Sequence, residues 1–248
     1  MKRVLLVTGG SRGIGAATAR LAALSGYAVC LSYLHNGDAA EAVVGDIRRA
    51  GGMAMASAAD VSVEDDVLRL FKCVDDAFGP LTALVNNAGI LAGQARVEQM
   101  DAARLARVFA TNVTGSFLCA REAVRRMSTR NGGAGGAIVN ISSAAARLGS
   151  PGEYVDYAAS KGAIDTFTLG LAKEVAAEGV RVNAVRPGVI YTDIHASGGE
   201  PERVDRVKDS VPMKRGGYAD EVARAVVWLL SDEASYSTGT FIDVSGGR

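Results

Sequence analysis

The chain has 248 residues, of which 48% are apolar and 22% are charged, a composition typical of a globular protein with a substantial core. A chain of this length buries roughly 70–75% of its unfolded surface, so it needs neither a disulfide framework nor a structural metal. Lysine plus arginine number 27, and aspartate plus glutamate also number 27. This balance gives no electrostatic basis for a nucleic-acid partner or for an anionic membrane surface.

Cysteine and histidine usage narrows the class of protein further. Cys30, Cys73 and Cys119 are far apart in apolar contexts, which is typical of buried, reduced thiols. His35 and His195 are the only histidines, so we expect no metal site. The first three residues lead directly into a short apolar run, and no run approaches the ~20 residues of a membrane span. These features predict a cytoplasmic protein with no membrane partner.

Short β-rich runs alternate with longer amphipathic stretches along the chain. The runs are continuously apolar, which is typical of parallel strands covered on both faces. We predict strands over residues 4–8, 28–33, 54–58, 83–86, 137–142, 181–185 and 240–244. We predict helices over residues 14–25, 39–50, 63–78, 103–127, 157–178 and 220–230. This order predicts a single α/β domain over residues 1–248, doubly wound and of the Rossmann type, with a mostly seven-stranded parallel sheet.

A glycine-rich turn joins the first predicted strand to the first helix. Its sequence, GGSRGIG over residues 9–15, spaces the glycines as G-x-x-x-G-x-G rather than as the usual G-x-G-x-x-G. Backbone N–H groups and the helix dipole at such a turn form an anion site. A flexible helix cap is the alternative, but the place in the first βα unit favours nucleotide binding. The candidate cofactor residues of the turn are Gly9, Ser11, Arg12, Gly13, Ile14 and Gly15.

This turn is one of a series of motifs that occur in the order and approximate spacing of a known family. The series is Thr8-Gly9-x-x-x-Gly13-x-Gly15, Asn86-Asn87-Ala88-Gly89, Asn112, Ser143, Tyr157-x-x-x-Lys161 and Pro187-Gly188. Together these motifs resemble the short-chain dehydrogenase/reductase family, and the resemblance covers the whole chain. One motif alone is weak, whereas the ordered set is highly specific. The resemblance implies an oxidoreductase with a nicotinamide dinucleotide cofactor.

Tyr157 and Lys161 lie four residues apart on a predicted helix and therefore share one face. A tyrosine hydroxyl has a pKa near 10, so acid–base work near neutral pH needs a downward shift of roughly 3 units. A cation ~4 Å away contributes about 4 kcal/mol in a partly desolvated site, so we expect Lys161 to supply much of this shift. The resemblance assigns the acid–base role to Tyr157 and a nicotinamide-ribose contact to Lys161. It also implies that Ser143 donates to the substrate oxygen and that Asn112 holds a water that relays protons.

Two of these assignments have competitors nearby in the sequence. Ser142 precedes Ser143 at the end of the fifth strand, and we favour Ser143. Fourteen residues separate Ser143 from Tyr157, one more than in many family members, so an extra residue is expected within residues 149–156. Tyr154 is an alternative acid, but its i+4 neighbour is an alanine, which cannot lower a pKa. We therefore expect Tyr154 to be a wall of the substrate pocket.

The end of the second strand bears on the choice of cofactor, because a carboxylate there normally holds the ribose 2′-hydroxyl of NAD. The sequence LSYLHN over residues 31–36 has no carboxylate, and Asp38 is expected to be the N-cap of the next helix. Arg12 suits the 2′-phosphate of NADP. NADP(H) is therefore preferred, with NAD(H) possible. The resemblance implies these further cofactor contacts: Tyr33, Asp60, Val61, Asn87, Ala88, Gly89, Pro187, Gly188, Ile190 and Thr192.

The expected function is NADP(H)-dependent hydride transfer between the nicotinamide and a small carbonyl or secondary alcohol. NAD-linked polyol or sugar dehydrogenases and reductases of carrier-bound acyl groups are alternatives. A non-catalytic NADP-binding regulatory protein is an alternative of another class. Residues 191–215 have weak periodicity and are expected to form a substrate lid. The candidate pocket residues are Leu91, Ala145, Leu148, Tyr154, Val189 and His195.

Two predicted helices, 103–127 and 157–178, carry apolar residues over more than one stripe. A helix packed on a sheet needs one stripe only, so the surplus predicts burial against another subunit. The resemblance implies two different two-fold contacts, which generate a homotetramer of D₂ symmetry. The apolar residues are Leu105, Val108, Phe109, Phe117 and Leu118 on the first helix, and Ile164, Phe167, Leu169 and Leu171 on the second.

Overall fold

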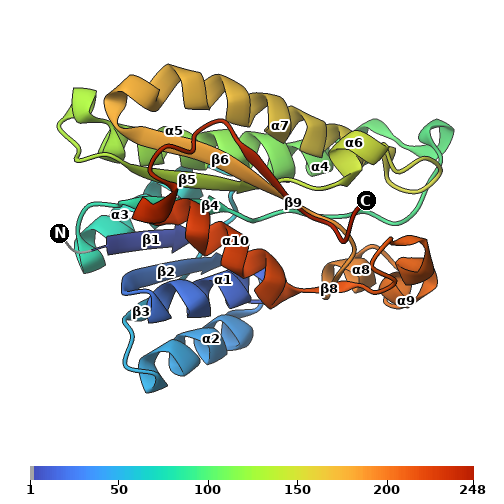
Figure 1. The fold of residues 1–248 in the computed structure, drawn as a ribbon, viewed down its shortest axis with the longest axis horizontal. Helices are drawn as coiled ribbons and strands as arrows, with labels where there is room; N and C mark the ends of the chain where they lie inside the picture. Colours follow the sequence, from blue (N-terminus) through green and yellow to red (C-terminus); the bar gives the residue numbers. More distant parts are fainter. Residues whose placement is uncertain (1–2) are drawn as a thin grey trace.

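The computed structural model describes residues 3–248 and arranges them around one parallel sheet (Figure 1). Its seven strands pair in the order β3-β2-β1-β4-β5-β6-β9. The strands are β1 (Arg3–Val7), β2 (Tyr27–Tyr33), β3 (Ala54–Ala58), β4 (Ala83–Asn86), β5 (Gly136–Ile141), β6 (Val180–Pro187) and β9 (Phe241–Val244). The predicted α/β class and seven-stranded parallel sheet are confirmed, and each predicted strand end lies within two residues of the observed one.

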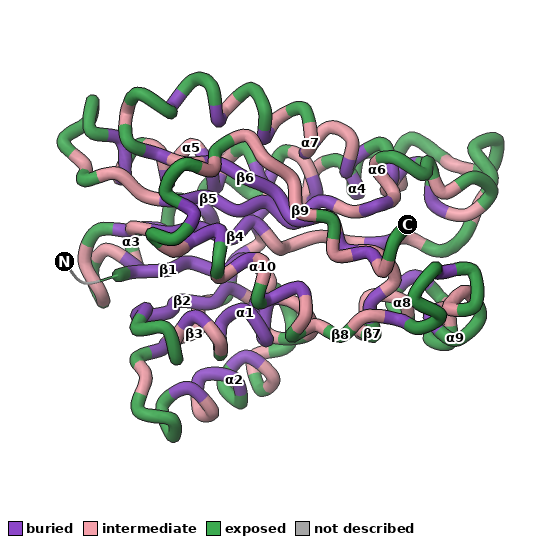
Figure 2. The backbone as a smooth tube through the Cα atoms, in the orientation of Figure 1, coloured by how far each residue is buried: buried purple, intermediate pink, exposed green. Residues whose placement is uncertain are grey.

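Helices cover both faces of this sheet. Alternate side chains of β1 show how the core is divided: Leu5 and Val7 pack with α1, α2 and α10, whereas Val4 and Leu6 pack with α3, α5 and α7. These helices are α1 (Gly13–Leu24), α2 (Gly37–Arg49), α3 (Glu64–Phe78), α5 (Gly115–Met127), α7 (Val155–Val175) and α10 (Ala219–Leu230). The central strands are buried along their length, and the helices expose their outer faces (Figure 2). Within residues 3–248, no helix is long and apolar enough to cross a membrane.

The strand order reverses between β1 and β4, and this reversal creates the crevice in which the candidate site lies. β1 pairs with β2 on one side and with β4 on the other. Beyond β4, Thr8 Oγ1 accepts hydrogen bonds of 3.0 Å from the backbone N–H groups of both Asn87 and Ala88. Open α/β sheets bind ligands at such a switch point, outside the carboxyl ends of the strands.

The helix predicted over residues 103–127 is confirmed, and a π-helical turn lies within it. α4 (Ala102–Phe109) is followed by the π-helical turn Ala110–Thr114, and α5 begins at Gly115. The wider turn places the buried Asn112 beside the backbone of Ile90. The side-chain amide of Asn112 accepts a hydrogen bond from the N–H of Ile90 and donates one to its carbonyl. A Cβ on Gly115 would lie 2.8 Å from Val61 Cγ2, so α5 packs closely on the loop after β3. Single π-helical turns within helices frequently occur at functional sites.

The prediction that Asp38 caps the second helix is wrong. α2 begins at Gly37, and the side chain of Asn36 accepts a hydrogen bond of 3.0 Å from the N–H of Ala39. Asp38 therefore lies in the first turn, where its carboxylate interacts favourably with the helix dipole. The helix starts earlier because Asn36 is itself a good capping residue.

Residues 191–215 form a compact segment beside the mouth of the crevice (Figure 1). It contains α8 (Ile194–Ser197) and α9 (Arg203–Val207), and it lies between the two short strands β7 (Ile190–Tyr191) and β8 (Gly217–Tyr218). Arg203 pairs with Glu153 at 2.6 Å, and Arg206 pairs with Glu153 at 2.9 Å and also with Glu200. These ion pairs fasten the segment to the loop that precedes α7.

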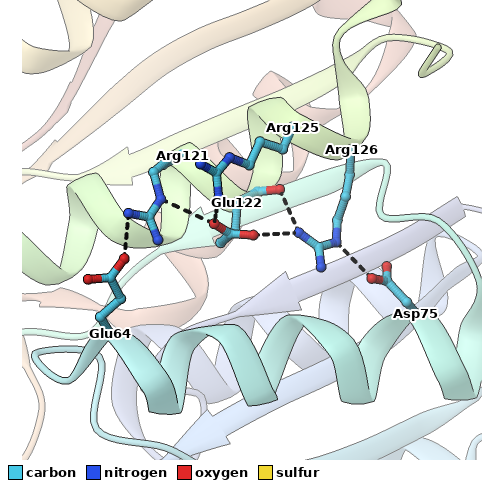
Figure 3. A network of polar contacts seen from close by, with 6 residues as sticks. All are labelled: Glu64, Asp75, Arg121, Glu122, Arg125 and Arg126. Carbon is cyan, nitrogen blue, oxygen red and sulfur yellow. Dashed lines mark hydrogen bonds and ion pairs between the residues drawn. The ribbon is translucent and has the colours of Figure 1, made fainter. Parts of the chain in front are cut away.

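A buried carboxylate joins α3 to α5 (Figure 3). Glu122 has a side chain only 5% exposed and accepts hydrogen bonds from three arginines of its own helix. Two of those arginines also reach carboxylates of α3. The members of this network are Glu64, Asp75, Arg121, Glu122, Arg125 and Arg126. The arginines lower the pKa of Glu122 against the effect of its burial, so the carboxylate is ionised at neutral pH.

Candidate active site

The glycine-rich turn has the backbone geometry of an anion cradle. Gly9 and Gly13 have φ angles of 63° and 52°, a region that favours glycine. A Cβ on Gly10 would lie 2.5 Å from Leu31 Cβ, so the turn packs closely on β2. α1 begins at Gly13 with no side-chain cap, which leaves backbone N–H groups of its first turn to bind an anion. These features fit the pyrophosphate of a dinucleotide.

A cavity of about 870 Å³ runs from this turn to the start of α7 and to residues 191–215. Of the residues predicted to bind the cofactor, all line this cavity except Gly15. Gly15 instead packs closely against the Asn87 side chain inside the turn, where a Cβ on Gly15 would lie 2.5 Å from Asn87 Nδ2. The cavity therefore brings together residues from the ends of β1, β2, β3, β4, β5 and β6, as a switch-point site requires.

Ser143, Tyr157 and Lys161 meet at the inner wall of this cavity. Ser143 follows β5, and its Oγ accepts a hydrogen bond of 3.1 Å from the N–H of Ala145. Its hydroxyl is also hydrogen-bonded to Tyr157. Lys161 Nζ lies 5.5 Å from the centre of the Tyr157 ring and donates a hydrogen bond of 2.7 Å to the carbonyl of Ile141. α7 thus places the phenol of Tyr157 and the ammonium group of Lys161 near the hydroxyl of Ser143 at the end of β5.

Burial dominates the protonation of these groups. It raises the pKa of Tyr157 to about 12, against a smaller lowering by the hydrogen bond from Ser143. It lowers the pKa of Lys161 to about 8, and the negative charge of Asp165 partly opposes this shift. The expected lowering of the Tyr157 pKa by Lys161 is therefore not found, because desolvation of the phenolate is the largest influence on this pKa. At neutral pH Tyr157 carries a proton that it can donate.

The competing candidates occupy different positions. Ser142 also lines the cavity, but its Oγ donates a hydrogen bond of 2.6 Å to Asp165 Oδ1. Tyr154 lines the cavity, as expected of a wall, and is only 2% exposed. Its hydroxyl has no hydrogen-bond partner, and the guanidinium of Arg203 lies 4.9 Å from its ring centre. Neither residue is placed beside an ammonium group as Tyr157 is.

Asn112 does not line the cavity and lies behind Lys161. Its Oδ1 accepts from the N–H of Ile90 at 2.8 Å, and its Nδ2 donates to the carbonyl of Ile90 and to Ser160 Oγ. A Cβ on Gly89 would lie 3.4 Å from Asn112 Oδ1 and 3.6 Å from Lys161 Nζ. The Asn112 amide therefore fixes the loop after β4 next to the lysine, and Oδ1 retains a second lone pair for a water molecule.

A buried ion pair anchors the start of α7 directly before Tyr157. Asp156 accepts hydrogen bonds of 2.7 and 3.2 Å from Arg104 of α4, and its side chain is 1% exposed. The guanidinium and the backbone N–H of Tyr157 lower the pKa of Asp156 against the effect of burial. Arg104 also donates to the carbonyl of Gly93 at 2.7 Å. These contacts fix the position of Tyr157 relative to α4.

At the opposite end of the cavity, Arg12, Tyr33, His35 and Asn36 line the wall that follows β2. No carboxylate lies at the tip of this strand, and Arg12 donates only a weak hydrogen bond of 3.3 Å to Ser197 Oγ. Asp60, expected near the adenine, accepts bonds from the N–H and Oγ of Ser62 with one carboxylate oxygen. A cationic side chain thus lies at this end of the cavity, and no carboxylate stands at the tip of β2.

The end of the cavity beyond Tyr157 is walled by all six candidate pocket residues. Several residues that sequence reasoning missed join them, among them Glu153, Arg203 and Arg248. Ser160 and Asp165 were also missed, although they bond Asn112 and Ser142. Asp165 follows Lys161 by four residues, as Lys161 follows Tyr157, and this spacing on one helix face is the signal that could have found it.

Comparison with known proteins agrees with this geometry. Residues 9–248 match the family profile described as "Enoyl-(Acyl carrier protein) reductase". The chain is 64% identical to the Escherichia coli protein "Uncharacterized oxidoreductase YgfF" over 245 residues, which cover 99% of each chain. It is 39% identical to the 3-oxoacyl-[acyl-carrier-protein] reductase of Synechocystis, over 99% of this chain and 96% of the relative.

Solved structures give the same result. A short-chain dehydrogenase/reductase variant from Serratia marcescens superposes with a TM-score of 0.91 at 34% identity, covering 99% of this chain and 97% of the other. A dehydrogenase/reductase from Sinorhizobium meliloti has the same TM-score and identity, with coverages of 99% and 94%. The fold, the placement of Ser143, Tyr157 and Lys161, and these similarities agree. The chain belongs to the short-chain dehydrogenase/reductase family of oxidoreductase enzymes.

Proposed function

We propose that this enzyme is a single-domain, NADP(H)-dependent oxidoreductase that interconverts a small carbonyl compound and the corresponding secondary alcohol. The observation that carries this proposal is the meeting of Ser143, Tyr157 and Lys161 on a cavity that also contains the glycine-rich turn. A nicotinamide cofactor held there would supply hydride to the carbonyl carbon or accept it from the alcohol. The residues of the chain then bind and orient the substrate and transfer the proton.

Tyr157 is the proposed proton donor during carbonyl reduction. Burial keeps its hydroxyl protonated at neutral pH, and the hydrogen bond with Ser143 directs the two hydroxyls to one place. Both can donate to the carbonyl oxygen, and these bonds strengthen as negative charge develops on that oxygen. Lys161 places a buried positive charge beside the phenolate that remains after proton transfer. Asn112 holds the loop after β4 and a water molecule, and this water returns a proton to Tyr157 by way of Lys161.

The preference for NADP(H) rests on the residues that follow β2. Arg12 provides a cation for a 2′-phosphate, and no carboxylate at the tip of β2 competes for a ribose hydroxyl. Asp60 and Val61 are assigned to the adenine, and Asn87 to Gly89 to its ribose. The segment from Pro187 to Thr192 is assigned to the nicotinamide and the phosphates. NAD(H) remains an alternative cofactor for the same turn.

A carrier-bound acyl substrate is the second candidate, because relatives named 3-oxoacyl-[acyl-carrier-protein] reductase are 36–39% identical to this chain. Acidic carrier proteins favour unpaired basic residues at the mouth of a site. Here Arg203 and Arg206 pair with Glu153, and Arg147 pairs with Asp243 at 3.3 Å. This pairing favours a small free carbonyl compound, with residues 191–215 as its lid.

A panel assay tests the function. The purified enzyme is mixed with NADPH or NADH and with aldehydes, ketones, polyols, sugars and 3-oxoacyl thioesters, and nicotinamide absorbance is followed. We expect turnover of small ketones or aldehydes with NADPH as the better cofactor. Exclusive turnover of thioesters would favour the carrier-protein function. Tight NADPH binding without any turnover would support a regulatory protein and contradict the proposed reaction.

We further propose a cytoplasmic homotetramer in which α4, α5 and α7 pack against a second copy. Val108 and Ile164 are core residues, but Phe117 is 48% exposed and stacks on Phe167 at 3.8 Å. Leu105, Phe109 and Leu169 are also exposed by 37–41%. The three cysteines are all free thiols, which supports a reducing compartment. Light scattering at micromolar concentration tests the assembly: a mass near four times 25.6 kDa is expected, and a stable monomer excludes it.

A further inference from the structure

Asp165 joins α7 and the end of β5, which carry candidate catalytic groups, to the neighbouring strand β6. It lies on α7 one turn after Lys161, and its Oδ1 accepts a hydrogen bond of 2.6 Å from Ser142 Oγ at the end of β5. Its Oδ2 pairs with Arg186 of β6, with distances of 3.0 Å to Nε and 2.9 Å to the terminal nitrogen. The side chains of Asp165 and Arg186 are 14% and 15% exposed. Both carboxylate oxygens are therefore engaged in a mostly buried setting.

The contact with Ser142 bears on the position of Ser143. The N–H of Ser142 bonds the carbonyl of Val185 at 2.9 Å, and the N–H of Ala144 bonds the carbonyl of Pro187 at 2.9 Å. The backbone on both sides of Ser143 is thus held by β6, while the side chain before it is held by α7. Ser142 Oγ also lies 3.3 Å from the carbonyl of Lys161. Asp165 and Ser142 therefore fix the distance between the end of β5 and the helix of Tyr157.

The charge of Asp165 bears on Lys161. Tyr157, Lys161 and Asp165 are spaced by four residues and share one face of α7. Tyr157 is the other titratable group beside Nζ, and it is neutral at neutral pH. Behind Asp165 stand Arg186 from β6 and Asp243 from β9, which lie 4.0 Å apart. The carboxylate of Asp165 is therefore the negative charge on this face that raises the pKa of Lys161, a residue that is only 4% exposed.

We propose that Asp165 is a positioning residue that holds Ser142 and α7 in register and supplies the negative charge that keeps the Lys161 ammonium protonated. This inference rests on the proposed function, because it assigns the Asp165–Arg186 pair to the support of Lys161 and Ser143. Arg186 has a defined part in it: its positive charge weakens the effect of Asp165 on Lys161.

The opposite effects of these two charges give a sharp test by NMR titration of protein without cofactor, labelled on lysine side chains. The chain has six lysines, and Lys161→Met identifies the Lys161 signal. Its midpoint is expected near pH 8 in the wild type. Asp165→Asn keeps the shape and the acceptor for Ser142 but removes the charge, so the midpoint should fall by about one pH unit. Arg186→Gln removes the positive charge and should raise the midpoint.

The surface variant Asp76→Asn is the matched control, because it removes a carboxylate that is 64% exposed and pairs with Lys72 on α3. It should leave the Lys161 midpoint unchanged. An unchanged midpoint in Asp165→Asn, or shifts of the same sign in Asp165→Asn and Arg186→Gln, would overturn the proposal. Should Asp165→Asn not fold, Arg186→Gln decides alone, since only an upward shift supports the proposal.

The titration separates this inference from the proposed function. If the wild type fails to reduce any carbonyl compound, the proposed function is wrong while the opposite shifts can still be observed. If the enzyme is active and the shifts are absent, only the role of Asp165 is wrong. In the active enzyme, kcat should fall as Lys161 loses its proton. The midpoint of this fall in the pH profile of kcat should move downward in Asp165→Asn by the same amount as the NMR midpoint.

Discussion

The two walls of the cavity are built in different ways. The inner wall, which carries Ser143, Tyr157 and Lys161, is supported by buried groups in short hydrogen bonds, and Asn112 and Ser142 are each only 1% exposed. The outer wall, formed by residues 191–215, is fastened by charged side chains, and Arg206 is 49% exposed. The inner wall depends on contacts from which water is excluded, whereas the outer wall depends on contacts that water and salt weaken.

This difference indicates a division of tasks. A proton donor must be held within a fraction of an ångström of its target, and buried hydrogen bonds provide that rigidity. The proposed lid must open to admit substrate, and partly exposed ion pairs such as Arg206–Glu153 contribute little enough to be broken and remade. We therefore expect substitutions in the inner wall to change kcat and substitutions in the outer wall to change KM.

The largest effect is expected from Tyr157→Phe, which removes the proposed proton donor and keeps the ring. General acid catalysis contributes about 10²- to 10⁴-fold, so kcat should fall by that amount while the Kd for NADPH changes little. Stopped-flow turnover and fluorescence titration measure the two quantities. Tyr154→Phe is the matched comparison, because it loses a hydroxyl without a hydrogen-bond partner and should retain most of its kcat. The reverse result would place the donor one helical turn earlier.

A smaller effect is expected from Arg12→Ala, which acts on the binding of the cofactor. Loss of charge-assisted hydrogen bonds to a 2′-phosphate should raise the Kd for NADPH about 10- to 100-fold. The Kd for NADH should change much less, because NADH lacks that phosphate. Calorimetric titration of the wild type and the variant with both cofactors checks this. Equal or tighter NADH binding by the wild type would contradict the assigned preference.

A still smaller effect is expected from Glu153→Gln, which breaks the ion pairs between the loop before α7 and Arg203 and Arg206. Partly exposed ion pairs contribute about 0.2–1 kcal/mol each, so KM should rise about 2- to 5-fold with kcat nearly unchanged. Added salt should raise the KM of the wild type toward that of the variant. Glu98→Gln, which removes an exposed partner of Arg96, should do neither. A fall in kcat alone would show that the outer wall also positions the reacting groups.

No kinetic effect is expected from Glu122→Gln, because Glu122 does not line the cavity. The substitution leaves three arginines around a neutral amide, so the free energy of unfolding should fall by about 1–3 kcal/mol. The pKa of Glu122 is lowered in the folded state, so its stabilisation is present above the unfolded pKa and is lost as the pH falls through the folded pKa. Urea unfolding measures the free energy of unfolding of the wild type and of the variant. The difference between the two proteins should therefore be smaller at pH 4 than at neutral pH.

Much of this could be predicted from the sequence, because the responsible interactions are local. The glycine spacing over residues 9–15, the apolar strands and the Tyr157–Lys161 spacing are set by neighbouring residues in the chain, and the structure places them as expected. Even the competitors Ser142 and Tyr154 could be weighed against Ser143 and Tyr157 from position alone. The substrate could not be predicted, because its pocket is assembled from segments far apart in the sequence.

Other features were decided only by the tertiary structure. The π-helical turn at Asn112 arises because that amide bonds Ile90 and Ser160, which lie 22 and 48 residues away. The raised pKa of Tyr157 depends on burial by the whole fold, which helical spacing does not measure. Asp165 carried a local signal, its spacing from Lys161, but its partners Ser142 and Arg186 come from β5 and β6. The sequence by itself determined which groups are candidates for the chemistry. Tertiary packing decided their protonation and support, because desolvation and long-range hydrogen bonds exist only once the sheet and helices have assembled.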